Sequence, residues 1–220
     1  MPGYAVRPRA LCFRTVLLNR EIIKMTHQHH PSCGVTAAEA LRRLKEGNGR
    51  YAENAAAHGD VSEARRLETA RKGQKPYAVV LCCSDSRSIP ETVFSAGIGD
   101  LFVIRVAGNV VDDHQLGSIE YASEHLGVRL VVVLGHTHCG AVKAAINHDP
   151  EGYVKTITDE VKAAIGEETD DAAAAALNAR AAVKKIEASL EIQDLEHDEG
   201  LRVLPAILDI ETGRVAFIED

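Results

Sequence analysis

Two short groups of cysteine and histidine residues carry the chemistry that this sequence offers. Cys83 begins the segment Cys83-Ser84-Asp85-Ser86-Arg87, and His136 and Cys139 lie in His136-Thr137-His138-Cys139-Gly140. Each group directly follows an apolar run that reads as a buried strand, at residues 77–82 and 130–135. Because open α/β sheets bind ligands at the carboxyl ends of their strands, we expect the two groups to meet at one edge of a sheet.

Two thiolates and one imidazole are a typical donor set for zinc. Three protein ligands leave a fourth position open, which is characteristic of a catalytic rather than a structural zinc ion. Neighbouring residues of a strand point to opposite faces, so we expect Cys82 to be a buried thiol and His138 to be a nearby or surface imidazole. The alternatives are a closed structural site, or cysteines that are merely buried. The sequence predicts one catalytic zinc ion per subunit, held by Cys83, His136 and Cys139.

The pattern around these ligands resembles the β-class carbonic anhydrases, which bind zinc through the C-S-D-S-R cysteine and the H-x-x-C histidine and cysteine. The resemblance covers residues 36–220 and is weakest after residue 150. It implies zinc-dependent, reversible hydration of carbon dioxide to bicarbonate and a proton, by attack of zinc-bound hydroxide. Because two thiolates place more negative charge on the metal than imidazoles do, we expect activity to rise toward alkaline pH. Hydrolysis of carbonyl sulfide or carbon disulfide, or a non-catalytic zinc-binding module, are the alternative functions.

The resemblance also implies roles for residues around the metal. Arg87 would hold the carboxylate of Asp85, which then accepts a hydrogen bond from the zinc-bound hydroxide and orients its lone pair. If that pair breaks, Asp85 would become the fourth zinc ligand of an inactive state. The other reading of the pair is an ordinary surface salt bridge. The positions that the resemblance assigns to substrate binding are Gln74, Phe102, Tyr121 and Gly140, which otherwise read as core aromatics and loop residues.

Composition narrows the class of protein. The 220 residues, 45% of them hydrophobic, fit one globular domain, and a net charge of −7 without a dense basic cluster argues against nucleic-acid and membrane partners. Five cysteines are an odd number and suggest no disulfide framework, so we expect a reducing, cytoplasmic location.

Residues 1–35 read as an N-terminal extension, disordered or preceding the true start, and organellar targeting by residues 1–24 is the alternative. Residues 36–220 read as the catalytic domain.

The expected fold is α/β, with a mostly parallel sheet flanked by helices. Apolar runs predict strands at residues 77–82, 101–106, 129–135 and 202–209, and an antiparallel edge strand at 215–218. Helical periodicity predicts helices at 65–72, 118–125, 159–165 and 171–195, after an N-terminal helical arm at 36–57 that Thr36 and Glu39 would cap. Such an arm has few ways to bury its apolar face on one small core, and in the family it lies across a partner subunit. We therefore expect a homodimer or a larger homo-oligomer.

Overall fold

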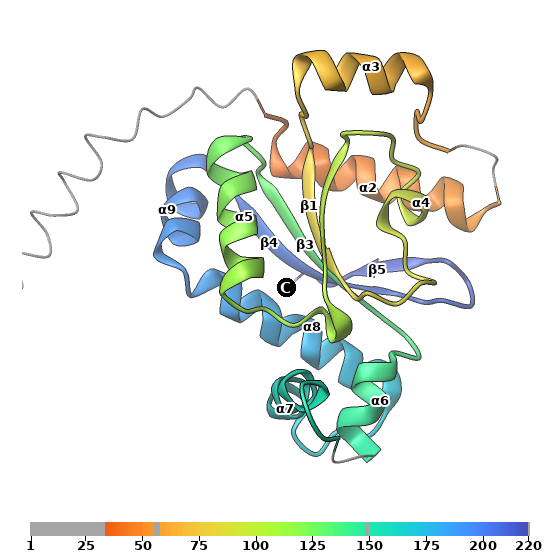
Figure 1. The fold of residues 1–220 in the computed structure, drawn as a ribbon, viewed down its shortest axis with the longest axis vertical. Coiled ribbons are helices and arrows are strands. Elements are labelled where there is room, and N and C mark those ends of the chain that lie inside the picture. Colours follow the sequence, from red (N-terminus) through yellow and green to blue (C-terminus); the bar gives the residue numbers. More distant parts are fainter. Residues whose placement is uncertain (1–33, 55–57, 148–149, 220) are drawn as a thin grey trace, which may run out of the picture. The chain divides into compact units, whose positions relative to one another are not determined.

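A five-stranded sheet forms the centre of the described part of the chain, which in this computed structural model comprises residues 34–54, 58–147 and 150–219. The strand order is β2-β1-β3-β4-β5 (Figure 1). β1, β2, β3 and β4 are parallel, whereas β5 pairs with β4 in the antiparallel direction. The predicted fold class is therefore confirmed. The strands are β1 (Ala78–Cys82), β2 (Leu101–Arg105), β3 (Leu130–His136), β4 (Arg202–Leu208) and β5 (Val215–Phe217).

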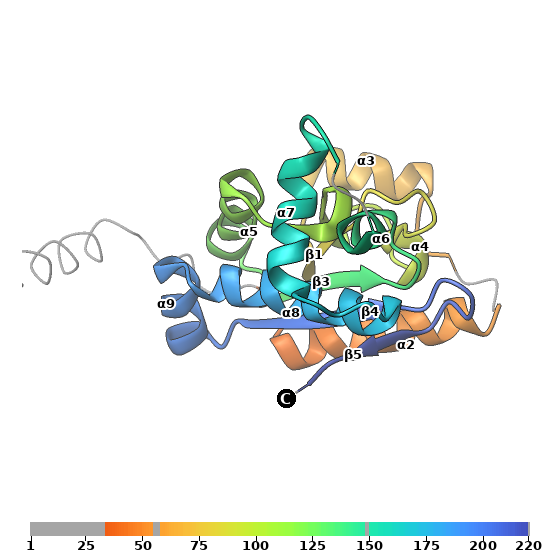
Figure 2. The same ribbon diagram turned by 90° about the horizontal axis from the view of Figure 1, so that it is seen from below.

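The central strands β1 and β3 are buried along their whole length, and their alternating side chains supply two cores. Val80 and Leu134 pack on one face of the sheet, together with helix α2 (Ala37–Ala52). Leu81 and Val133 pack on the other face, together with α5 (Asp113–His125) and α8 (Asp171–Glu187). Figure 2 shows α2 on one side of the sheet and α5 on the other. Burial of both faces explains why these strands read as continuous apolar runs.

The prediction that the N-terminal arm needs a second subunit to bury its apolar face is wrong for helix α2. Leu41 and Leu44 are buried in the core that α2 shares with β1, β3 and β4. The helix begins where expected, because the hydroxyl of Thr36 accepts a hydrogen bond from the backbone N–H of Glu39. Glu39 was predicted to cap the helix together with Thr36, but its carboxylate binds two arginines, Arg42 and Arg43. The apolar face of α2 thus finds its place on the chain's own sheet.

Helix boundaries differ from the predictions where capping residues were overlooked. The helix expected at 118–125 begins at Asp113, because Asp112 and Gln115 form a reciprocal capping box. The segment expected as one helix at 171–195 divides into α8 and α9 (Leu190–Glu199), and the hydroxyl of Ser189 caps the second. The remaining helices are α3 (Glu63–Lys72), α4 (Pro90–Val93), α6 (Gly140–Asn147) and α7 (Val154–Ile165), of which α4 and α6 were not predicted and α7 begins earlier than expected.

The predicted N-terminal extension at 1–35 lies almost entirely outside the described residues, so its nature stays a prediction. Within the described ranges, no helix combines the length and the apolar character that crossing a membrane requires.

Candidate metal centre

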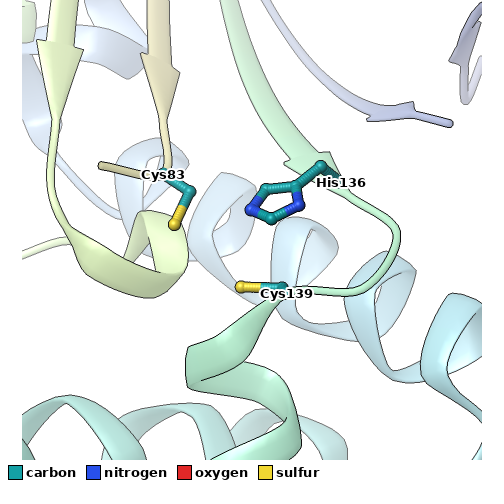
Figure 3. A group of neighbouring side chains, drawn as sticks. All are labelled: Cys83, His136 and Cys139. Atoms are coloured by element: carbon teal, nitrogen blue, oxygen red, sulfur yellow. The ribbon is translucent and has the colours of Figure 1, made fainter. Parts of the chain in front are cut away.

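The three predicted ligands come together at the carboxyl ends of two adjacent parallel strands. Cys83 directly follows β1, His136 is the last residue of β3, and Cys139 directly precedes α6. All three side chains are buried, and one ligand atom from each lies within 4.8 Å of the others. Figure 3 shows both sulfur atoms and the imidazole ring pointing into the same space. This arrangement fits one metal ion bound by two sulfur atoms and one nitrogen.

His136 presents the correct nitrogen for a metal. Its Nδ1 lies 2.8 Å from the carbonyl oxygen of Thr137, so Nδ1 carries the proton and Nε2 keeps its lone pair. Nε2 is buried and has no hydrogen-bond partner among the described residues. A buried polar atom without a partner is costly, and a metal ion would satisfy it. The backbone N–H of Thr137 donates to the carbonyl of Leu208, which fixes this turn to the end of β4.

The two thiols shift each other's pKa in opposite directions. A hydrogen bond from Cys139 lowers the pKa of the Cys83 thiol, and the same pairing raises the pKa of Cys139. The Cys83 sulfur also accepts a hydrogen bond of 3.3 Å from the backbone N–H of Gly108. A divalent cation would replace the shared proton and bind both sulfur atoms as thiolates.

The close approach of the Gly108 backbone to this sulfur requires glycine. Its φ of 70° is left-handed, and a Cβ there would lie 3.1 Å from the Cβ of Ala141. The carbonyl of Gly108 accepts a hydrogen bond of 2.7 Å from the buried side-chain amide of Asn178. Sequence reasoning missed both contacts. The Ala107-Gly108-Asn109 segment after β2 was a usable signal for the first, whereas nothing marks Asn178 within its alanine-rich helix.

Cys82 and His138 lie outside the ligand group, as the sequence predicted. Cys82 packs in the core on the α2 side of the sheet, and burial raises its thiol pKa to about 12. The His138 side chain is 57% exposed, and its ring lies between the carboxylates of Asp171 and Glu211, at 3.7 and 3.5 Å. Neither side chain contributes a ligand atom to the group.

Asp85 and Arg87 form a two-point ion pair beside the ligands. The guanidinium donates from Nε to Oδ1 at 2.9 Å and from Nη2 to Oδ2 at 2.7 Å. These hydrogen bonds hold the pKa of the Asp85 carboxyl well below its usual range. Oδ2 lies 3.9 Å from Nε2 of His136, so the carboxylate adjoins the ligand group. Nη2 of Arg87 also donates to the carbonyl of His138 at 3.1 Å, which connects the two ligand-bearing loops.

The structure separates the predicted substrate-binding residues into two sets. Gly140 directly follows Cys139 at the start of α6. Phe102 pairs with Val79, four residues before Cys83 and so about 13 Å back along β1. The Tyr121 ring lies tilted beside the Phe102 ring with centroids 6.2 Å apart, and Gln74 precedes β1 at its amino end. Within one chain, Gln74, Phe102 and Tyr121 therefore lie away from the metal ligands.

Comparison with known proteins gives the family. The family model described as carbonic anhydrase matches residues 78–215, which include all three ligands as well as Asp85 and Arg87. The chain belongs to the carbonic anhydrase family. Solved β-carbonic anhydrases share its fold. One is a β-carbonic anhydrase of Sordaria macrospora, described as tetrameric, which is 26% identical to this chain with a TM-score of 0.66. The match covers 83% of this chain and 96% of that one. A β-carbonic anhydrase of Aspergillus fumigatus is 27% identical with a TM-score of 0.65, over 83% and 90% of the two chains.

Curated carbonic anhydrases from mycobacteria are more similar in sequence. Carbonic anhydrase 2 of Mycobacterium tuberculosis is 48% identical over 127 residues, which are 56% of this chain and 61% of that protein. The carbonic anhydrase of Mycolicibacterium smegmatis is 44% identical over 131 residues, 57% of this chain and 63% of that one. The match thus spans about three fifths of the length of these carbonic anhydrases.

Proposed function

We propose that this chain is a zinc enzyme that reversibly hydrates carbon dioxide to bicarbonate and a proton. The observation that carries the proposal is the convergence of two sulfur atoms and a partnerless, buried Nε2 within 4.8 Å, beside an ionised carboxylate. Cys83, His136 and Cys139 would hold the ion. When bound by three protein ligands, zinc lowers the pKa of water and supplies hydroxide near neutral pH. Membership of the carbonic anhydrase family supports this reaction.

Asp85 and Arg87 would orient the attacking water. Because Arg87 keeps the pKa of Asp85 low, the carboxylate stays ionised and can only accept hydrogen bonds. Oδ2 lies beside the ligand atoms, so a water there would donate to it and turn a lone pair toward the substrate. Release from Arg87 would let Asp85 become the fourth ligand of an inactive state. Holding the carboxylate is thus the proposed role of Arg87 in catalysis.

The surroundings of the ligands suit a small uncharged substrate. Cys83 and Cys139 pack in one buried cluster with the aliphatic side chains of Val110, Val142 and Val161. Apolar neighbours of this kind suit a small uncharged molecule better than a large polar one. They are compatible with carbon dioxide, and equally with carbonyl sulfide or carbon disulfide, so substrate choice has to be measured.

Gln74, Phe102 and Tyr121 would line the substrate pocket of a second copy of the chain rather than their own. Two observations support this assignment: their distance from the chain's own ligands, and the 48% exposure of Tyr121 on the helix beside the edge strand β2. The Sordaria macrospora structure, described as tetrameric, also favours a homo-oligomer. We propose a cytoplasmic homodimer or larger assembly.

The experiment is a rate measurement on the purified protein with carbon dioxide, carbonyl sulfide and carbon disulfide in turn, together with zinc analysis. Cys83→Ser, His136→Ala and Cys139→Ser should each lose the metal and the activity. His197→Ala is the matched control for the histidine change, because the His197 side chain is 88% exposed on α9 and is not part of the ligand group, and it should keep both. Faster turnover of either sulfur-containing gas would assign the scaffold to that substrate. Stoichiometric zinc with no turnover of any gas would indicate a non-catalytic module.

A further inference from the structure

Arg105 reaches from β2 to the loop that carries Cys83 and Asp85. It is the last residue of β2, the edge strand beside β1. Its Nε donates to the backbone carbonyl of Cys83 at 3.1 Å, and its Nη2 donates to the backbone carbonyl of Asp85 at 2.6 Å. One guanidinium therefore binds the main chain of one candidate ligand, Cys83, and of Asp85, whose carboxylate lies beside the ligand group.

These two hydrogen bonds supplement a short set of backbone contacts. Ser84 donates its N–H to the carbonyl of Val106 at 3.3 Å, and Ser88 donates to the carbonyl of Asp85 at 3.0 Å. The loop leaves the sheet at Cys82, where the ladder between β1 and β2 ends. Beyond Cys82, rotation of a peptide plane would change the direction of the side chain on the neighbouring Cα. Holding the two carbonyls thus limits where the sulfur atom and the carboxylate can point.

We propose that Arg105 is a positioning residue for the metal centre, acting through the backbone of Cys83 and Asp85. Its two contacts keep the Cys83 sulfur within reach of the other ligands and keep the Asp85 carboxylate beside them. The guanidinium donates to neither the sulfur nor the carboxylate. The effect of Arg105 on metal affinity does not depend on the proposed function. Only its effect on the rate of carbon dioxide hydration rests on that function.

The shape of the guanidinium, rather than its charge alone, is what the two contacts require. Arginine presents several N–H groups in a fixed planar fork, so it can donate to two carbonyls at once. Lysine keeps the positive charge but concentrates its donors on one flexible nitrogen atom. Arg105→Lys therefore separates geometry from charge, and Arg105→Gln removes both. The matched control is Arg202→Gln, since Arg202 lies at the amino end of β4, where its side chain contacts Glu219 at 3.9 Å.

The test measures zinc affinity of the full-length, zinc-loaded chain by competition with a chromophoric chelator. The cobalt-substituted protein is measured in parallel for its thiolate-to-metal absorption. Arg105→Gln and Arg105→Lys should both bind zinc about 10- to 100-fold more weakly and show altered cobalt bands, as expected when residues that orient metal ligands are lost. Arg202→Gln should match the unsubstituted chain. Circular dichroism and light scattering confirm that all variants are folded and equal in mass.

The outcomes distinguish this role from the proposed function. Unchanged zinc affinity and cobalt bands in Arg105→Gln would overturn the role, and full rescue by Arg105→Lys would show that charge alone suffices. Carbon dioxide hydration is measured on the same samples. If the unsubstituted chain binds zinc but hydrates no carbon dioxide, the proposed function fails while the metal-affinity result still decides the role of Arg105.

Discussion

Replacing Arg87 by lysine should slow carbon dioxide hydration without removing zinc. The arginine side chain makes two hydrogen bonds to the Asp85 carboxylate and a third to the carbonyl of His138. A lysine ammonium keeps the charge but cannot reproduce the planar two-point contact, and it cannot also reach the other loop. Asp85 would then lose its fixed orientation beside the ligand group. The three metal ligands themselves are untouched by the change.

The expected loss follows from the contacts removed. A hydrogen bond involving a charged group contributes about 1.5–3 kcal/mol, and lysine would forfeit at least one of the two to Asp85. The Arg87 side chain is 49% exposed, so water offsets part of this energy, whereas the Asp85 side chain is only 17% exposed. We expect a net loss of about 1.4–2.8 kcal/mol, which corresponds to roughly a 10- to 100-fold decrease in kcat/KM.

The assay is stopped-flow hydration of carbon dioxide, with zinc content measured on the same samples. Arg66→Lys is the matched control, because Arg66 is 68% exposed and contacts Glu63 only at 3.7 Å. It should retain the kcat/KM of the unsubstituted chain. Full activity of a zinc-loaded Arg87→Lys would refute the reasoning, since the orientation of Asp85 would then not limit the rate. Loss of zinc from this variant would instead assign Arg87 to metal retention.

Three further predictions concern stability and assembly. Burial raises the pKa of Tyr77 from 10.0 to about 12, so the folded state keeps a neutral phenol at a pH where the unfolded chain ionises. The free energy of unfolding should therefore fall as pH rises above 10, by about 1.4 kcal/mol at pH 11. Urea titrations should show that Tyr77→Phe removes this loss. Asn48→Ala should cost about 2–4 kcal/mol of unfolding free energy, because this buried amide bonds two carbonyls and one N–H, of Val93, Gly213 and Val215. Light scattering of the active enzyme should give at least twice the chain mass of 23.7 kDa.

Each of these has a contradicting result. An identical decline of stability for the unsubstituted chain and Tyr77→Phe between pH 9 and pH 11 would show that Tyr77 ionises normally in the fold. An unchanged urea midpoint for Asn48→Ala would mean that water replaces the lost hydrogen bonds. A fully active monomer would exclude a pocket completed by Phe102 and Tyr121 of a second copy.

The sheet and the clustering of Cys83, His136 and Cys139 were predictable because their signals are local. β1 and β3 are apolar runs buried on both faces, and the ligands follow them directly, so strand and motif could be read together. The start of α5 and the break before α9 were equally local, since Asp112 and Ser189 are capping residues, but they lie in segments that were read by periodicity alone. Attention to caps would have found both.

Long-range side-chain contacts could not be read from the sequence. Arg105 binds carbonyls 20 and 22 residues away, and Asn178 bonds a carbonyl 70 residues away. Neither contact leaves a periodic pattern, because only the assembled sheet and helices bring the partners together. Likewise, the sequence did not show that α2 buries its apolar face on its own core, since that depends on the space between the helix and the sheet.

The central claim is that one zinc ion held by Cys83, His136 and Cys139 makes this chain hydrate carbon dioxide. The most direct measurement is the initial hydration rate of the metal-free, full-length protein during titration with zinc. The rate should start at the uncatalysed level, rise in proportion to bound zinc, and reach its plateau at one ion per chain. A hydration rate that is already maximal without zinc, or that stays at the uncatalysed level when the site is filled, would contradict the account.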